Sequence, residues 1–335
     1  MVNVLITGGG GFVGARLARE LLATGSIAVD GQSPRPIGQL TLLDQAPLPP
    51  DLAGNPAVTG VQGDLLDLLL PGGQGLDPTV AADVIFHLAA AVSGECEADF
   101  DLGLRANVQA TEALLAVVRS AQTRPVLAFA SSAAAFGDSP DHPLPDVVDD
   151  QTAPNPQTSY GAQKVICEQL IADYTRKGYL RGRPVRLMTV SVRPGRPNAA
   201  ASGFMSGIIR EPLAGQRAIC PVTPDTAVVL SSPANTIRGL LRAVSADEDT
   251  WGGRSAVNLP ALSVTVAEMV AALEEVAGEA VTALIDWKPD ETIQQIVSTW
   301  PGNLRADRAA RLGLAPDPDF RSIIEQHIAE TTGTR

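Results

Sequence analysis

The chain has 335 residues, about twice the usual ~150-residue domain, so we expect one large α/β domain or a core with a smaller appended domain. Its 25 Lys and Arg residues against 37 Asp and Glu give a formal net charge of −12, which repels phosphate backbones and anionic lipid. The chain is 45% hydrophobic, yet no apolar run approaches the ~20 residues of a membrane helix. Nucleic acid and membranes are therefore not expected partners.

Three cysteines, Cys96, Cys167 and Cys220, lie far apart in the sequence. Their spacing fits neither a zinc site nor a disulfide framework, so we expect reduced thiols and no metal. The segment MVNVLIT starts at Met1 and has neither the basic residues nor the small-residue cleavage site of a signal peptide. We expect a cytoplasmic protein.

Strand-like and helical segments alternate along the first part of the chain. Residues 2–7 are apolar and β-branched, and 12–25 place apolar residues at helical spacing before a terminal glycine. The polar stretch 30–39 is expected to be a surface loop before a strand at 40–44. Further strands are predicted at 58–64, 82–90, 124–132 and 183–195, and helices at 107–121 and 161–176. Nearly all-apolar strands alternating with helices predict a doubly wound, Rossmann-like parallel sheet covered on both faces.

The later part of the chain has a less regular pattern. We expect a first domain of residues 1–195 and a smaller lobe of residues 196–335, part of which, near 226–245, packs back on the first domain. A helix is predicted within 263–278, and the Asp-rich stretch 145–151 is expected to be a solvated loop.

The turn after the first predicted strand reads TGGGGFVG, with glycines at positions 8, 11 and 14. One glycine permits the tight turn, another lets backbone amides approach a pyrophosphate, and the third lets the helix pack closely on the strand. The N-terminus of the following helix adds partial positive charge. A flexible loop can have the same composition, but the position between the first strand and the first helix indicates a dinucleotide site.

Acidic residues stand at the ends of the next predicted strands. Asp44 is placed to accept hydrogen bonds from the ribose hydroxyls of NAD and to repel the 2′-phosphate of NADP, which favours NAD. A plain loop aspartate is the alternative, because Asp44 lies further from Gly14 than the usual ~20 residues. Asp64 is placed to meet the adenine amino group. The segment HLAA (87–90) puts small residues where a cofactor would cross the sheet edge, and its histidine is expected to be packed inside or at that edge.

Tyr160 and Lys164 stand four residues apart at a predicted helix start, so both side chains project from one face. A nearby ammonium stabilises a phenolate, the form of tyrosine that removes a proton. Such a pair also arises by chance in helices. Here, however, Ser131 and Ser132 close the preceding predicted strand and offer a hydroxyl to the reacting oxygen.

Together these pieces resemble the extended short-chain dehydrogenase/reductase superfamily over residues 1–195. The matching segments are TGGGGFVG, the strand-end Asp44, GD at 63–64, HLAA, Asn107, ASSAAAFG, YGAQK and VRPG. The resemblance implies that Ser132, Tyr160 and Lys164 are catalytic: the first two hold the substrate hydroxyl, and Tyr160 is the acid and base. It also implies a cofactor site formed by Gly8, Gly11, Phe12, Val13, Gly14, Asp44, Asp64, Leu65, Leu88, Ala89, Ala90, Asn107, Tyr160 and Lys164.

Departures from the superfamily patterns narrow the expected reaction. Sugar-nucleotide dehydratases follow the catalytic hydroxyl with an Asp-Glu pair, whereas Ala133 and Ala134 stand there in this chain. Phe136 replaces a tyrosine that is common before the glycine at 137, which argues against an epimerase. Simple oxidation of an alcohol or reduction of a ketone remains. A sugar-nucleotide epimerase or reductase is the alternative enzyme, and an NAD-binding redox sensor is the non-enzymatic alternative.

A narrower resemblance covers nearly the whole chain. Segments 90–111, 156–178, 190–215 and 257–274 are similar to the D-erythronate dehydrogenase family. That family oxidises the C2 hydroxyl of a four-carbon sugar acid with NAD, so the resemblance implies a small anionic sugar-acid substrate. The superfamily also implies a homodimer formed through the helices near 104–121 and 159–177.

The carboxylate of such a substrate needs a local partner, because the protein as a whole is acidic. Arg196 and Asn198, after the last predicted strand of the first domain, and Ser93, after the HLAA segment, are the candidates. Arg193 and Arg238 are equally plausible from the sequence alone.

Overall fold

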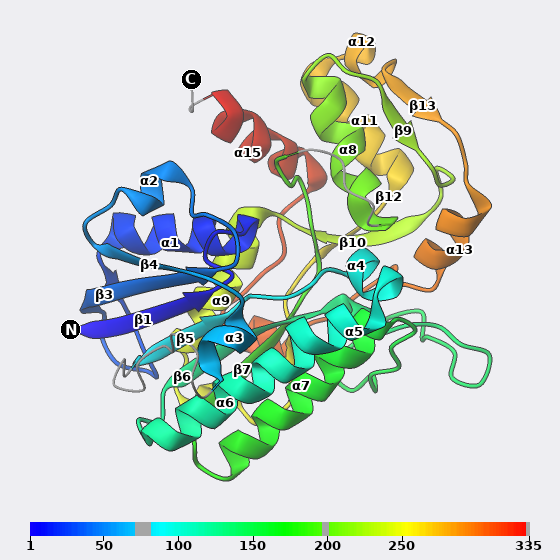
Figure 1. Cartoon of the computed structure of the whole chain (residues 1–335). Coiled ribbons are helices and arrows are strands. Elements are labelled where there is room, and N and C mark those ends of the chain that lie inside the picture. The colour runs from blue at the N-terminus through cyan, green and yellow to red at the C-terminus, as the bar shows by residue number, and fades with distance from the viewer. Residues whose placement is uncertain (71–81, 196–200, 333–335) are drawn as a thin grey trace. The chain divides into compact units, whose positions relative to one another are not determined.

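The computed structural model describes residues 1–70, 82–195 and 201–332 (Figure 1). Two compact units alternate along the chain, whereas the sequence places one boundary at residue 195. The first unit comprises Met1–Ala135, Thr158–Arg186 and Ile237–Val257, and the second comprises Phe136–Gln157, Leu187–Thr236 and Asn258–Arg335.

The first unit is built on an eight-stranded sheet in which β1 pairs in parallel with β3 and β5, and β5 pairs in parallel with β6. The strand order is β11-β7-β6-β5-β1-β3-β2, with β4 added beside β3. The strands are β1 (Val2–Thr7), β2 (Ser26–Ile27), β3 (Arg35–Asp44), β4 (Val58–Gln62), β5 (Val84–His87), β6 (Val126–Ser132), β7 (Arg181–Leu187) and β11 (Val257–Asn258). The predicted Rossmann-like sheet is confirmed.

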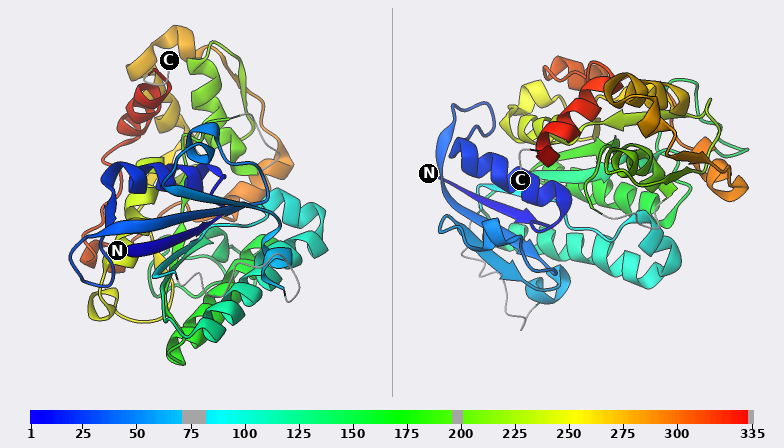
Figure 2. Two further views of the ribbon diagram at one scale, coloured as in Figure 1. Left: turned by 60° about the vertical axis from the view of Figure 1, so that its left-hand side comes forward. Right: turned by 90° about the horizontal axis from the view of Figure 1, so that it is seen from above.

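Helices cover both faces of this sheet: α1 lies on one face, and α6 and α7 run side by side on the other (Figure 1; Figure 2). Apolar residues of α6 and α7, such as Leu115 and Ile171, form one buried cluster with Leu127 and Phe129 of β6. This burial drives the docking of both helices. The helices of the first unit are α1 (Phe12–Thr24), α2 (Pro50–Ala53), α3 (Leu65–Leu69), α4 (Ser93–Ala98), α5 (Phe100–Gly103), the π-helical η1 (Leu104–Gln109), α6 (Ala110–Ala121), the 3₁₀-helical η2 (Ala133–Ala135), α7 (Ser159–Arg176) and α10 (Glu248–Trp251). Helix α9 (Pro233–Ser245) begins in the second unit and ends in the first.

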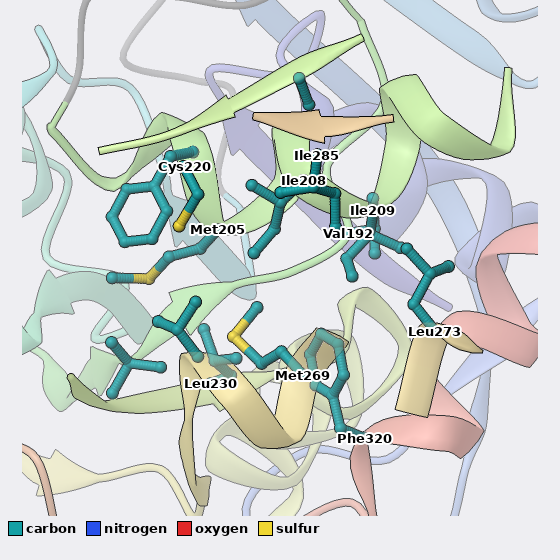
Figure 3. Packing of buried hydrophobic residues seen from close by; sticks show 14 of the residues in the cluster. Val192, Met205, Ile208, Ile209, Cys220, Leu230, Met269, Leu273, Ile285 and Phe320 are labelled. Carbon is teal, nitrogen blue, oxygen red and sulfur yellow. The ribbon is translucent and has the colours of Figure 1, made fainter. Parts of the chain in front are cut away.

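The second unit has two small sheets, with strand orders β12-β10-β8 and β13-β9. Their helices enclose an apolar cluster that includes Ile208, Leu230, Met269 and Phe320 (Figure 3). The strands are β8 (Thr189–Val190), β9 (Ala218–Cys220), β10 (Ala227–Ser231), β12 (Leu262–Thr265) and β13 (Ile285–Trp287). The helices are η3 (Ala201–Gly203), α8 (Phe204–Leu213), α11 (Val266–Ala277), α12 (Glu279–Thr282), α13 (Glu291–Ser298), α14 (Asp307–Arg311) and α15 (Phe320–Thr332). The helix predicted within 263–278 is confirmed as α11.

Two predicted loops prove wrong in part. Residues 35–39 belong to β3, because Arg35 and Pro36 pair with β2 across an antiparallel bridge and the strand then runs on beside β1. In the Asp-rich stretch, Val148 is fully buried and exchanges backbone hydrogen bonds with residues 303 and 305. Pairing with a distant segment therefore overrides the local composition in both places.

In the ranges that the structure describes, no helix combines the length and the apolar character needed to cross a bilayer.

Candidate active site

The carboxyl ends of β1 and β5 lie next to each other at the centre of the sheet. Thr7, the last residue of β1, pairs with His87, the last residue of β5. On its other side β1 pairs with β3, so the chain after β1 builds one side of the sheet and the chain after β5 builds the other. In open α/β sheets ligands bind just beyond such a reversal, which places the candidate site at these strand ends.

The glycine turn between β1 and α1 has the close contacts of a dinucleotide cradle. A Cβ on Gly14 would lie 2.1 Å from the carbonyl oxygen of Gly8, so only glycine fits there. Gly8 has a φ of +72°, and a Cβ on it would lie 2.7 Å from the amide nitrogen of Ala89. Gly11 is the N-cap residue of α1. Among the described residues no side chain caps this helix end, and its first turn, which holds Phe12 and Val13, contains no acidic residue. The turn therefore fits a pyrophosphate.

Asp44 ends β3 beside this turn. One carboxylate oxygen accepts a hydrogen bond from the amide of Gly10 at 2.9 Å, and the other accepts one from the amide of Ala46 at 2.9 Å. These two bonds fix the carboxylate at the edge of the cradle. Each oxygen keeps a lone pair for a ribose hydroxyl, so the geometry is compatible with the predicted role.

Asp64 is already engaged by other groups. It is the N-cap of α3, accepts a hydrogen bond from the amide of Asp67 at 3.1 Å, and lies 3.4 Å from a guanidinium nitrogen of Arg105. The next residue, Leu65, is buried. Contact of these two residues with the adenine stays a prediction.

The segment after β5 is held from both sides. The amides of Leu88 and Ala89 donate to the backbone oxygen and the hydroxyl of Thr7, at 3.1 Å and 3.3 Å. Beyond the exposed Ala90, the amide of Ala91 donates to the side-chain oxygen of Asn107 at 2.8 Å. Asn107 also donates to the Gln163 side chain at 2.7 Å and is only 3% exposed. Asn107 thus positions the backbone of this segment from the interior, and any direct contact with the cofactor stays a prediction.

The start of α7 brings Tyr160 and Lys164 together. Thr158 caps the helix, and its hydroxyl accepts a hydrogen bond from the amide of Gly161 at 3.0 Å. The ammonium of Lys164 lies 5.5 Å from the centre of the Tyr160 ring and donates to the backbone oxygen of Ala130 at 2.8 Å. Lys164 is buried and Tyr160 half-buried. A fixed cation beside this ring stabilises a phenolate.

The two serines that end β6 have different environments. Ser132 is half-buried, and its oxygen accepts a hydrogen bond from the amide of Ala134 at 3.1 Å, a bond that does not use its hydroxyl proton. Ser131 is buried and donates to a carboxylate oxygen of Glu168 at 2.5 Å. Its proton is therefore committed inside the protein. This difference agrees with the choice of Ser132 over Ser131 as the catalytic hydroxyl.

A buried ion pair that was not predicted from the sequence lies next to Ser131. Glu168 follows Lys164 by four residues on α7, and Arg186 of β7 binds both of its carboxylate oxygens, at 2.9 Å and 2.7 Å. With the bond from Ser131, this pair joins α7 to β6 and β7 directly behind the candidate catalytic groups. The spacing of Tyr160, Lys164 and Glu168 puts all three on one helix face, a signal that was present in the sequence.

The residues predicted to bind the substrate carboxylate are spread over several segments. Ser93 is the first residue of α4 and is half-buried. Arg193, in the second unit, donates to the Ser202 hydroxyl at 3.2 Å. Arg238 belongs to α9, and Arg196 and Asn198 lie outside the described residues.

The three cysteines are free and buried, and burial raises the pKa of each thiol. Within the described part of the chain, no group of three or more His, Cys, Asp or Glu side chains is arranged to hold a metal ion.

Comparisons with known proteins cover nearly the whole chain. Residues 4–230 match the profile described as the NAD dependent epimerase/dehydratase family. The chain is 47% identical to a D-erythronate dehydrogenase of Cupriavidus necator over 98% of both chains. It is 40% identical to a D-erythronate dehydrogenase of Haemophilus influenzae over 98% of this chain and 99% of the other. A solved nucleoside-diphosphate-sugar epimerase of Agrobacterium tumefaciens is 39% identical, with a TM-score of 0.89 over 99% of this chain and 95% of the other.

Proposed function

Because the chain belongs to the NAD-dependent epimerase/dehydratase family and is an NAD-dependent oxidoreductase acting on a CH–OH group, we propose that it oxidises the C2 hydroxyl of D-erythronate to the 2-oxo acid. The observation that carries the chemistry is the Lys164 ammonium 5.5 Å from the Tyr160 ring. The substrate follows from the names of the two relatives, which match the chain almost end to end.

Three side chains divide the work of the reaction. Ser132 and Tyr160 hold the substrate hydroxyl between them, and the Tyr160 phenolate removes its proton. The glycine turn and Asp44 would hold NAD, which would supply the acceptor for the hydride that leaves C2. Lys164 stabilises the phenolate, and its bond to the backbone oxygen of Ala130 fixes the ammonium at this position. The hydroxyl proton goes to Tyr160, and the hydride, with its two electrons and one proton, would be taken up by the cofactor.

An assay of the purified protein, in which NADH formation is monitored by absorbance, tests the proposal. D-erythronate, L-threonate, D-threonate and a UDP-hexose are supplied in turn with NAD, and the series is repeated with NADP. Turnover of D-erythronate with NAD, well above that of the other acids, is expected. If only another sugar acid were oxidised, the proposed substrate would be wrong and the proposed class of reaction would stand.

A sugar-nucleotide epimerase or reductase is the second candidate, because the Agrobacterium structure carries an epimerase name. Ala133 and Ala134 follow Ser132 in this chain, so the carboxylate pair of a dehydratase is not present at that point. Absence of turnover with every sugar acid, together with tight binding of the UDP-hexose, would favour this candidate and overturn the first.

We also propose that the protein forms a homodimer through the helices at 104–121 and 159–177. Apolar side chains are exposed beside them: Phe100 on α5 is 60% exposed and Ile166 on α7 is 44% exposed. A second copy of the chain packed on these helices would remove apolar surface of this kind from water. Light scattering after size exclusion should give twice the mass of 34.8 kDa, and a monomer would contradict this proposal.

A further inference from the structure

His87 connects three segments of the first unit and has no role in the chemistry above. Its ring is 1% exposed at the end of β5. The Nδ1 atom lies 2.7 Å from the hydroxyl oxygen of Thr7 on β1, and the Nε2 atom lies 2.8 Å from the hydroxyl oxygen of Thr111 on α6. Both ring nitrogens therefore have a partner inside the protein.

The neighbouring bonds determine which nitrogen carries the proton. The Thr111 hydroxyl donates to the backbone oxygen of Asn107 at 2.6 Å, since a carbonyl can only accept. Thr111 has no second proton, so its oxygen accepts from His87, and Nε2 must be the protonated nitrogen. In a neutral ring Nδ1 then accepts from the Thr7 hydroxyl, whose oxygen accepts the Ala89 amide proton at 3.3 Å.

The surroundings keep this ring neutral. Burial and, to a smaller extent, the charge of Lys164 lower the pKa of His87 from its ordinary value to about 3. The Phe129 ring connects the two groups, since its centre lies 5.6 Å from that of His87 and 4.8 Å from the Lys164 ammonium. A protonated His87 would be repelled by the Lys164 ammonium and would lose its hydration. The ring is therefore neutral and carries its proton on Nε2.

The hydrogen bonds that run from Thr111 through His87 to Thr7 end at the Ala89 amide, where the segment after β5 meets the glycine turn. The Ala89 amide donates to Thr7, and the same nitrogen would lie 2.7 Å from a Cβ on Gly8. We infer that His87 is a positioning residue for the NAD cradle: it orients the Thr7 hydroxyl, which sets the distance between the Gly8 turn and the Ala89 segment. This inference concerns the cofactor, and so it goes beyond the substrate proposed above and does not depend on it.

Two amide variants test the two hydrogen bonds of His87 separately, the one to Thr7 and the one to Thr111. In His87→Asn the side-chain oxygen can take the place of Nδ1 and accept from Thr7, while the link to Thr111 is lost. In His87→Gln the terminal amide can replace Nε2 and donate to Thr111, while the link to Thr7 is lost. Both variants remove the ring, so each is the packing control for the other.

Calorimetric titration with NAD, in the absence of substrate, measures the effect. We expect His87→Asn to bind NAD within about threefold of the unaltered protein and His87→Gln to bind about tenfold more weakly, the loss of one hydrogen bond. Thr7→Val, which keeps the shape and removes the hydroxyl, should match His87→Gln. Equal NAD affinities for all three variants and the unaltered protein would show that His87 only packs the core, and would overturn the inference.

NMR of the imidazole nitrogens in the unaltered protein gives a second test that needs no variant to fold. The Nε2–H tautomer should persist across neutral and mildly acidic pH. A Nδ1–H tautomer, or titration near the ordinary pKa of about 6.5, would overturn the inference.

Discussion

Two buried regions of the molecule use their side chains differently. In the first unit, His87, Asn107, Lys164 and Glu168 are buried polar side chains, and each hydrogen-bonds a residue in or shortly after a strand of the candidate site. The cluster in Figure 3, in the second unit, consists of aliphatic, aromatic and sulfur-containing side chains such as Ile208.

Physical chemistry gives these two kinds of interior different tasks. A buried polar group is costly unless it finds its partner in one geometry, so it specifies position more than it adds stability. Apolar burial adds stability with little direction. Substitutions of these polar side chains should therefore act mainly on binding and turnover, and substitutions in the Figure 3 cluster mainly on the free energy of unfolding.

Replacing the Tyr160 hydroxyl should have the largest effect. We expect Tyr160→Phe to lower kcat about 10³-fold, because general acid and base catalysis is lost, with NAD affinity within about twofold of the unaltered protein. Steady-state kinetics and NAD titration measure the two quantities. Tyr174→Phe, further along the same helix, is the control. A redox sensor would bind NAD and show no turnover before or after the change, which would contradict the enzymatic role.

Truncation of an apolar side chain in the second unit should lower stability and leave NAD affinity nearly unchanged. Ile208 is fully buried on α8, and Ile208→Ala should lower the free energy of unfolding by about 3 kcal/mol through the lost burial and the cavity left behind. Urea denaturation measures this change. Ile219→Ala, at a 56% exposed position, should change it by less than about 0.5 kcal/mol. A loss of NAD affinity in Ile208→Ala as large as the loss of stability would contradict the division of tasks.

His87 should make the protein less stable in mild acid. Its pKa of about 3 in the folded protein lies below the 6.5 of an unperturbed histidine, so the unfolded chain binds the extra proton between these values. The contribution of His87 to the free energy of unfolding is complete above pH 6.5 and declines as the pH falls. This contribution should be about 2 kcal/mol smaller at pH 5 than at pH 7.5. Denaturation curves at both values should show a weaker pH dependence for His87→Gln, and an unchanged dependence would contradict the neutral buried ring.

The smallest expected effect concerns the edge of the cradle. Asp44→Asn should raise the Kd for NAD about tenfold, because the ribose hydroxyls lose a charged acceptor, and should narrow the preference for NAD over NADP. Titration with each cofactor measures both changes. Asp51→Asn, an exposed carboxylate on α2 paired with Arg19, is the control. Equal affinities for Asp44→Asn and the control would leave Asp44 with a purely structural role in the turn.

Local pattern was sufficient for the parts of the site that depend on near neighbours. The glycines at 8 and 14 were predictable because a tight turn and a close helix contact exclude a Cβ. Tyr160 and Lys164 were predictable because four residues separate neighbours on a helix face. Residues 35–39 and Val148 were misjudged because they extend a strand that pairs with β1, or pair with residues 303 and 305, and these partners are distant in the chain.

Hydrophobic period, backbone freedom and helical spacing are local properties, so the class of sheet, the glycine turn and the tyrosine and lysine on one helix face follow from the sequence. Contacts between distant segments are needed to learn which serine hydroxyl is committed to Glu168, which tautomer His87 adopts and why Asn107 lies inside. Each depends on a partner that another strand or helix brings within hydrogen-bond distance, and the direction of each bond follows from what that partner can donate or accept.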